Sequence, residues 1–155
     1  MELCVKTFSE LTNEELYDLL ALRTAVFVVE QCCPYQDADG LDRQALHVWL
    51  KDENGIHAYL RIMDRGVCGE EIRIGRVIAV ERRKGLGSRV LAAGIAAAGE
   101  RFGPGRIAVE AQVYAKRLYE KQGFRVASEE FLEDGIPHVK MVLDAVHAEQ
   151  RPYTE

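Results

Sequence analysis

The residues best suited to chemistry in this sequence form one short basic run, Arg82-Arg83-Lys84-Gly85-Leu86-Gly87. Glycine lets the backbone turn sharply and come close to a ligand. The first N–H groups of a helix that begins here would have no partners inside the helix. Those N–H groups, the helix dipole and three cationic side chains together favour an anion, so the run predicts a pyrophosphate-binding loop. The alternative is a basic turn that simply precedes an amphipathic helix.

Two familiar phosphate loops are excluded by the spacing of the glycines. The sequence has no GxxxxGK[ST] run, so the loop is not a Walker A motif. The third glycine of a dinucleotide-binding GxGxxG motif would fall at Leu91, so that motif is absent too. A different kind of phosphate ligand is therefore expected.

Charge is distributed unevenly along the chain, although the net charge is only −5, from 25 acidic and 20 basic residues. Residues 72–89 carry six basic side chains against Glu81. Residues 30–42 and 128–134 carry acidic side chains and no basic ones. One basic and two acidic segments suggest two ligands of opposite charge, the alternative being ordinary solvated surface. An acidic chain is not expected to bind nucleic acid generally.

The cysteines and histidines give no sign of a metal site or a disulfide. No CxxC pair or zinc spacing is present, and Cys32 and Cys33 are too close for an ordinary bridge. We expect four reduced thiols, no metal, and a cytoplasmic protein. The N-terminus shows no secretory signal, and the nearly apolar stretch 90–99 is about half the roughly 20 residues that span a bilayer.

The hydrophobic pattern predicts the elements that must position the basic loop. A capping box (Thr12 and Glu15) begins a helix that ends before Pro34, with apolar residues at helical spacing as far as Phe27. Asn54-Gly55 marks a hairpin. Strands are expected over 3–8, 46–51, 56–64, 72–80, 106–111, 124–131 and 138–143, and further helices over 85–101 and 115–122. This order indicates one mixed α/β domain over 1–144 and a polar tail over 145–155.

Two motifs resemble signatures of the GNAT superfamily of N-acyltransferases. Arg82-x-x-Gly85-x-Gly87 matches its acyl-CoA pyrophosphate loop, [QR]-x-x-G-x-[GA]. Residues 112–124 resemble its second signature, N-x-x-A-x-x-L-Y-E-x-x-G-F, with Gln112 where Asn is common. Segments 26–42 and 132–138 resemble the ElaA-like branch, so the resemblance runs from about residue 16 to 143. The stretch 75–87 is shorter than usual in the family, which leaves the register before the loop open.

The resemblance implies a GNAT-type mixed central β-sheet, splayed at the fourth and fifth strands and flanked by helices. Acetyl-CoA is the implied co-substrate, with its pantetheine arm in the gap and no metal. The implied donor-binding residues are Ile78, Ala79, Val80, Arg82, Arg83, Lys84, Gly85, Leu86, Gly87, Ser88, Gln112 and Ala115. The implied activity is transfer of an acetyl group to a primary amine by direct attack.

The resemblance also assigns roles at the reacting centre. Tyr119 stands where GNAT enzymes commonly protonate the departing thiolate, and a phenol is a suitable donor; its alternative role is packing. His138 is a candidate catalytic residue whose alternative is a structural hydrogen bond. Other candidate bases by type are Glu30, Asp37, Asp39, Asp42 and Glu110, and a water chain could serve instead of any of them.

The acidic segments are expected to attract the amine. The predicted acceptor-binding residues are Glu30, Gln31, Asp39, Asp42 and Glu133, although Asp and Gly also favour turns without any ligand. A small amine or a peptide amine is the expected partner, with no nucleic acid or membrane, and a homodimer is possible. Trp49 and Tyr59 are expected in the core. The alternative function is a catalytically silent acyl-CoA-binding sensor on the same fold.

Overall fold

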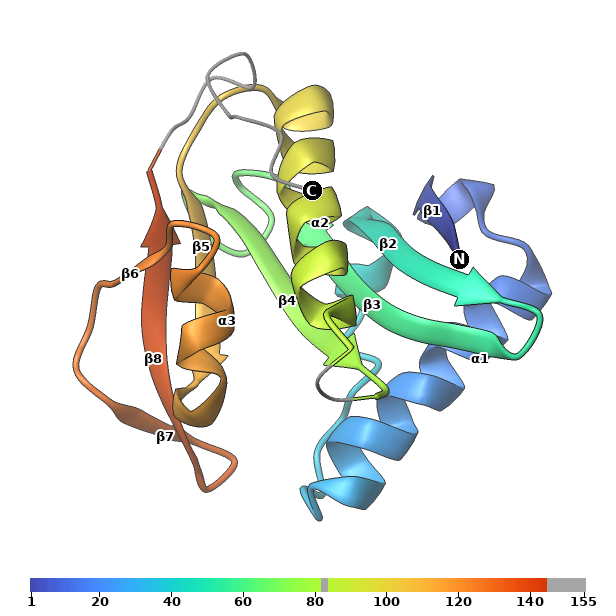
Figure 1. Ribbon diagram of the computed structural model, residues 1–155, viewed down its shortest axis with the longest axis horizontal. Coiled ribbons are helices and arrows are strands. Elements are labelled where there is room, and N and C mark those ends of the chain that lie inside the picture. Colours follow the sequence, from blue (N-terminus) through green and yellow to red (C-terminus); the bar gives the residue numbers. More distant parts are fainter. Residues whose placement is uncertain (82–83, 145–155) are drawn as a thin grey trace.

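A twisted β-sheet with helices on both sides forms the molecule, shown as a computed structural model in Figure 1. The structure describes residues 1–81 and 84–144, so Arg82, Arg83 and the predicted tail 145–155 lie outside the described residues. The strands are β1 (Glu2–Thr7), β2 (Ala45–Asp52), β3 (Gly55–Met63), β4 (Ile72–Ala79), β5 (Ile107–Gln112), β6 (Arg125–Val126), β7 (Phe131–Glu133) and β8 (Ile136–Leu143). The α-helices are α1 (Asn13–Arg23), α2 (Leu86–Phe102) and α3 (Lys116–Glu120).

The sheet has the strand order β1-β2-β3-β4-β5-β8-β6, with β7 paired to β8. Neighbouring strands are antiparallel except β4 and β5, which are parallel and pair at Ile72 with Ile107 and at Arg73 with Ala108. Beyond these pairs the two strands diverge (Figure 1). The prediction of a mixed sheet splayed at the fourth and fifth strands is confirmed.

A β-bulge in β4 accompanies the divergence. One residue of β3 lies between Tyr59 and Arg61, whereas two residues of β4, Arg76 and Val77, lie between their partners Gly75 and Ile78. Arg76 has φ +54°, the left-handed conformation that is strained for a residue with a side chain. A bulge bends its strand and increases the local twist, so it turns the end of β4 away from β5. This fixes the strand register that the sequence left open.

The N-terminal helix begins as expected and ends differently. Thr12 Oγ1 accepts a hydrogen bond from the Glu15 N–H (3.1 Å), and Glu15 Oε1 accepts one from the Thr12 N–H (2.9 Å), which confirms the capping box. The α-helix ends at Arg23, and a π-helical segment, Thr24–Glu30, follows. The prediction of one regular helix as far as Phe27 is therefore wrong, because the wider π-turn brings that side chain toward the sheet.

Two hydrophobic clusters cover the two faces of the sheet. The larger joins α2 and α3 to the sheet through residues such as Leu60, Val90 and Met141. The smaller joins α1 to the other face and contains Trp49 and Tyr59, as predicted. At Gly94, α2 lies so close to β3 that an added Cβ would be 2.8 Å from Leu60 Cδ2. None of the helices in the described part of the chain is long and apolar enough to cross a membrane.

The C-terminal region departs from the predicted strand over 124–131. It forms two short strands, β6 and β7, because 127–130 is exposed and the Ser128 hydroxyl accepts a hydrogen bond from the Lys140 N–H (2.8 Å). A two-residue turn with positive φ, Asp134 (+52°) and Gly135 (+76°), joins β7 to β8. This is the turn that matches the twist of a hairpin, so β8 begins at Ile136 and not at His138.

Ion pairs between arginine and aspartate tie the N-terminal segment to β3 and β4. The fully buried Arg23 pairs with Asp37 through Nε (2.9 Å) and with Asp42 through Nη1 (2.6 Å). Arg61 pairs with Asp42 and Asp39, and Arg76 pairs with Asp37 and Asp39. We call these six residues the Arg–Asp network: Arg23, Asp37, Asp39, Asp42, Arg61 and Arg76.

Removing Arg23 should destabilise the protein strongly. Arg23→Met preserves much of the volume but removes the cation from two buried carboxylates, and breaking a buried ion pair in this way costs about 3–5 kcal/mol. Urea unfolding measures the loss. Arg43→Met, at an exposed position with no ion pair in the described residues, should change the free energy of unfolding by less than about 0.5 kcal/mol. Equal effects of the two substitutions would contradict the importance of the network.

Candidate active site

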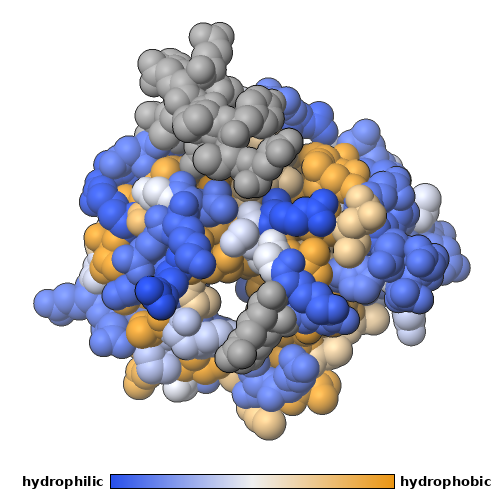
Figure 2. Space-filling view, viewed as in Figure 1, coloured by the Kyte–Doolittle hydropathy of each residue, from blue (hydrophilic) through white to orange (hydrophobic). Residues whose placement is uncertain are grey.

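A cavity of about 1130 Å³ occupies the gap between β4 and β5. Figure 2 shows it as a hollow that opens between α3 and the N-terminal end of α2. Its walls come from β4 and the π-helical segment on one side, and from β5, α3 and the β7–β8 hairpin on the other. The divergence of the two strands therefore opens this cavity within the sheet.

The predicted anion loop leads into α2 beside this opening. Gly85 precedes the helix with φ +73°, and within the described residues no side-chain hydrogen bond caps the helix. The N–H groups of Leu86, Gly87 and Ser88 are therefore available to an anion. The side chain of Leu86 is buried in the core, so it can contribute only its backbone. Lys84 forms an exposed ion pair with Glu81 (2.8 Å), which a stronger anion could displace.

The last residues of β4 form the adjoining wall. Ile78, Ala79 and Val80, which were predicted to bind the donor, all line the cavity. The N–H of Val80 donates to the His57 carbonyl of β3 (2.9 Å). Because successive backbone groups of a strand point to opposite sides, those of Ala79 point toward the cavity. The side chain of Ile78 packs in the smaller cluster, so here too the backbone is the group available to a ligand.

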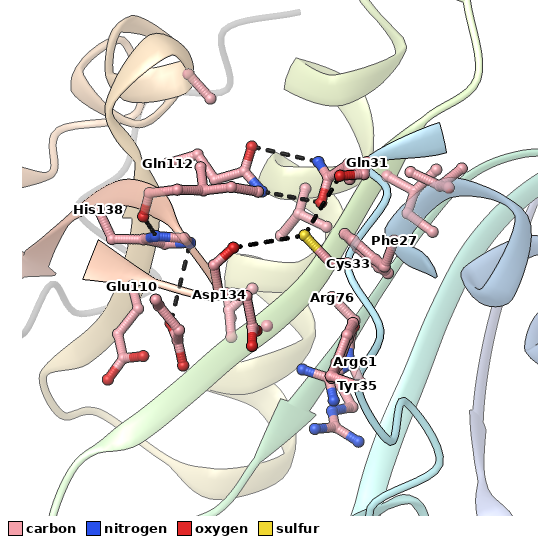
Figure 3. Close-up of a pocket in the computed structure, with 18 of the residues that line it drawn as sticks. Phe27, Gln31, Cys33, Tyr35, Arg61, Arg76, Glu110, Gln112, Asp134 and His138 are labelled. Carbon is pink, nitrogen blue, oxygen red and sulfur yellow. Dashed lines mark hydrogen bonds and ion pairs between the residues drawn. The ribbon is translucent and has the colours of Figure 1, made fainter. Parts of the chain in front are cut away.

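The segment that follows the π-helix crosses the cavity. The side-chain amides of Gln31 and Gln112 exchange two long hydrogen bonds (3.3 and 3.4 Å), and the Cys33 thiol donates to the Asp134 carbonyl (3.6 Å) (Figure 3). Gln112 and Ala115, which were predicted to bind the donor, both line the cavity. Gln112 of β5 thus contacts Gln31, a predicted acceptor residue, from the opposite wall of the cavity.

Tyr119 projects from α3 into the same cavity and is 6% exposed. Its ring packs edge-on against Phe124, with 5.7 Å between ring centroids. Burial raises the pKa of Tyr119 well above its ordinary value, and Tyr114 adds to the shift. The phenol is therefore protonated at neutral pH. No group among the described residues forms a hydrogen bond with its hydroxyl, which leaves the proton available to a molecule in the cavity.

His138 lies on β8 across the cavity from Arg61 and Arg76 (Figure 3). It is 8% exposed, and its Nδ1 is 2.7 Å from the Ile136 carbonyl oxygen. The structural hydrogen bond weighed in the sequence is therefore present, and the second ring nitrogen, Nε2, lies 3.9 Å from Glu133 Oε2. Nδ1 is therefore held by the Ile136 carbonyl, whereas Nε2 faces the carboxyl group of Glu133.

The predicted acidic acceptor wall is only partly formed. Asp42 is buried in the Arg–Asp network and does not line the cavity, and Asp39 is paired with Arg61 at 2.6 Å. The expectation that these two carboxylates attract an amine is corrected, because arginines already neutralise them. Glu30 and Gln31 line the cavity, as does Glu133. Within the residues that the structure describes, no cluster suited to a metal ion is present.

Sequence reasoning missed the basic side of the cavity. Arg61, Arg73 and Arg76 all line it, together with Tyr35, whose ring lies 5.4 Å from the Arg76 guanidinium carbon. One feature of the sequence indicates this basic side: Arg61 follows Tyr59 and Leu60 in an otherwise apolar strand. An arginine buried in such a strand needs a carboxylate partner. Their partners lie 19 to 39 residues away in the chain, and no local pattern identifies them.

Comparison with known proteins assigns this architecture to a class. Escherichia coli ElaA is 38% identical over 90% of this chain and 94% of its own, and its crystal structure superposes with a TM-score of 0.87 over 92% of this chain and 99% of its own. The crystal structure of an acyl-CoA N-acyltransferase from Pseudomonas aeruginosa matches with 36% identity, a TM-score of 0.87 and the same coverage. The fold is that of the acyl-CoA N-acyltransferases.

The family follows from the sequence match itself. The family model described as an acetyltransferase (GNAT) domain matches residues 8–145, nearly the whole chain. This protein belongs to the GNAT acetyltransferase family, and the resemblance to its ElaA-like branch is confirmed. A Bacillus subtilis acetyltransferase solved in complex with CoA shares the fold alone, with 21% identity, a TM-score of 0.62, and coverage of 94% of this chain and 100% of its own.

The pairing of Asp39 predicts a pH dependence of stability. Burial alone would raise the pKa of Asp39, but hydrogen bonds from Arg61 and the Leu41 N–H lower it to about 2. A carboxylate with a lowered folded pKa stabilises the protein above its unfolded value of about 3.9, and this contribution is lost as the pH falls toward 2.

Urea unfolding of wild type and Asp39→Asn across a pH series tests this dependence. The wild type should exceed the variant in stability by a constant amount above about pH 5, and the difference should shrink between about pH 4 and 2. Asp18→Asn, at an exposed position of α1, serves as the matched control and should show no such trend. A difference for Asp39→Asn that is the same at pH 5 and pH 2.5 would show that its ion pairs do not stabilise the fold.

Proposed function

We propose that this protein is an acetyl-CoA-dependent N-acetyltransferase that moves the acetyl group to a primary amine, on a small molecule or a peptide, by direct attack. The observation that carries the proposal is the meeting of three features at the end of β4. The open edge of β4 and the buried phenol of Tyr119 line the cavity. The N-terminus of α2 does not line the cavity but lies beside its β4 wall, since a Cβ at Gly87 would be 3.6 Å from that of Ala79. A fold neighbour solved with CoA adds support for the donor.

Acetyl-CoA fits the donor side on physical grounds. Its pyrophosphate would accept hydrogen bonds from the first-turn N–H groups of α2, with Arg82, Arg83 and Lys84 supplying opposite charge. Its pantetheine amides would pair with backbone groups of β4 near Ala79 that have no partner on β5. The thioester would then lie between the two walls of the cavity, within reach of Tyr119.

The chemistry requires one nucleophile and one proton donor. The amine nitrogen attacks the thioester carbonyl carbon, the C–N bond forms and the C–S bond breaks. The departing thiolate takes the proton of Tyr119, which an amine proton replaces through the solvent. Burial raises the pKa of the phenol, and it raises the pKa of a thiol in the same cavity as well. The pKa values of the proton donor, Tyr119, and of the CoA thiol therefore stay close to each other.

Two substitutions at Gly87 test the donor site. A Cβ at this position would lie 3.5 Å from Leu118, an ordinary contact, so Gly87→Ala should fold and bind. Gly87→Asp favours the helix N-terminus electrostatically but repels a pyrophosphate there. At a hundredfold excess over its Kd, acetyl-CoA contributes about 2.7 kcal/mol to stability, a rise of roughly 5–10 °C in Tm. The Asp variant should lose this rise and the Ala variant should keep it. Equal shifts in both variants would refute the assignment of the loop.

Thiol release from acetyl-CoA in the presence of amines tests the activity, with Tyr119→Phe as the matched variant. The wild type should release CoA only when an amine is present. The Phe variant should keep its stability, since the hydroxyl has no partner to lose, and should lose about 10²–10⁴-fold in kcat, or roughly 3–5 kcal/mol of barrier. Unchanged kcat would return Tyr119 to a packing role. Binding of acetyl-CoA without release for any amine would favour the silent sensor.

A further inference from the structure

His138 is a buried base whose free nitrogen faces the cavity. The Ile136 carbonyl can only accept a hydrogen bond, so the neutral ring carries its proton on Nδ1, and Nε2 holds the lone pair. The ring also stacks on Phe131, with 5.9 Å between centroids, which fixes its orientation. The contact at Nε2 is with Glu133 Oε2 at 3.9 Å, which is too long for a hydrogen bond. Among the described residues, nothing donates a proton to this lone pair.

The charges around His138 come from three elements and are mainly negative. Glu133 lies on β7, Asp134 follows it in the turn, and Glu110 faces them from β5. Burial raises the pKa of Glu133, and the neighbouring Glu110 raises it further. Arg73 of β4 offsets Glu110 at 3.1 Å, whereas among the described residues Glu133 forms an ion pair only with His138, when that ring is protonated. Glu133 therefore has no permanent cation beside it within the described part of the chain.

The described arginines of the opposite wall are already in ion pairs with carboxylates. Arg61 and Arg76 are held by the Arg–Asp network, and Arg73 is held by Glu110. On the near wall, Lys140 lies on the same strand as His138, β8, and it pairs with Glu71 at 2.8 Å. Every described arginine that lines the cavity is thus already paired. An acceptor with a carboxylate next to its amine would bring an uncompensated negative charge into acidic surroundings.

We propose that His138 is the catalytic base and that Glu133 and Glu110 hold the acceptor, which is a cationic primary amine with no carboxylate beside it. This rests on the N-acetyl transfer proposed above. The ammonium donates hydrogen bonds to Glu133 and to Nε2 of His138. One proton passes to Nε2, and the imidazolium is stabilised by the Glu133 carboxylate and later releases this proton to water. The free amine then attacks the thioester, and its second proton is lost to the departing thiolate by way of Tyr119.

His138→Asn tests the base, because the asparagine amide can still donate to the Ile136 carbonyl while Nε2 is lost. We expect kcat to fall roughly 10²–10⁴-fold. The acidic limb of the pH–rate profile, which rises as the catalytic base loses its proton, should disappear. The rise in Tm with acetyl-CoA should persist and show that the variant is folded. If the acidic limb of the pH–rate profile remains in this variant at the same pH as in the wild type, the assignment of His138 as the base is overturned.

Glu133→Gln tests the role of the carboxylate. Because a carboxylate stabilises the imidazolium, its removal should move the acidic limb to lower pH. The KM for 1,4-diaminobutane should rise about tenfold or more, the loss of one charge-assisted hydrogen bond. Glu130→Gln, an exposed position between β6 and β7, is the matched control and should change neither quantity. Equal KM values for Glu133→Gln and this control would refute the docking site.

A matched pair of acceptors tests the substrate class. Propylamine and 2-aminobutyrate have the same chain at the amine, and 2-aminobutyrate adds a carboxylate on the carbon that carries the amine. Propylamine should be acetylated with a kcat/KM at least about tenfold higher at low ionic strength, and salt should narrow the gap. Equal kcat/KM values would overturn the substrate class. Failure of the wild type to release thiol with any amine would instead overturn N-acetyl transfer itself, so the two failures are distinguishable.

Discussion

Everything at the cavity depends on β4 leaving β5 while both strands remain in one sheet. A parallel pair that continued past Arg73 would fill the gap with its own hydrogen bonds, and no ligand could enter. The bulge at Arg76 and Val77 turns β4 away and leaves its backbone groups without strand partners. The strain of Arg76 is held in place from outside the strand, since its guanidinium contacts both Asp37 and Asp39.

The Arg–Asp network accounts for the different character of the two walls. Burying so many charges brings little net stability compared with a well-packed apolar core, and Arg61 Nε even lacks a partner among the described residues. The network does determine how the N-terminal segment lies against β3 and β4, because each planar guanidinium donates its hydrogen bonds only in certain directions. It fixes the segment that crosses the cavity and makes the β3–β4 wall electrically neutral. The β5–β8 wall, where Glu133 and His138 lie, keeps its charge.

Features that depend on neighbours in the chain were predictable. The capping box at Thr12, the turn at Asn54-Gly55 and the glycine at position 85 ahead of α2 each use residues within a few positions of one another. Together with the family motifs, they were enough to place Gly85 ahead of α2 and Tyr119 on α3. The order of the elements followed as well, except where Ser128 interrupts the predicted strand and divides it into β6 and β7.

Features that depend on distant partners were not predictable. Arg23 lies at the spacing of the apolar helix face, but its carboxylates lie 14 and 19 residues further on. The acidic loop was expected to face an amine because the sequence does not show which arginines lie opposite Asp39 and Asp42. The bulge at Arg76 could not be recognised in the sequence either, because one extra residue does not change the kind of residues that make up β4.

At Gly94, close to its middle, α2 is in direct contact with the Leu60 side chain of β3, so this contact sets the tilt of the helix relative to the sheet. Leu60 lies beneath the middle of the helix, and the N-terminus at Leu86 is eight residues away, roughly 12 Å along the axis. A methyl group at position 94 would tilt the helix about this fulcrum, and a tilt of about 5° would move the N-terminus by roughly 1 Å. Affinity at the donor site proposed above would thus be adjustable from the centre of the helix, at a residue distant from that site.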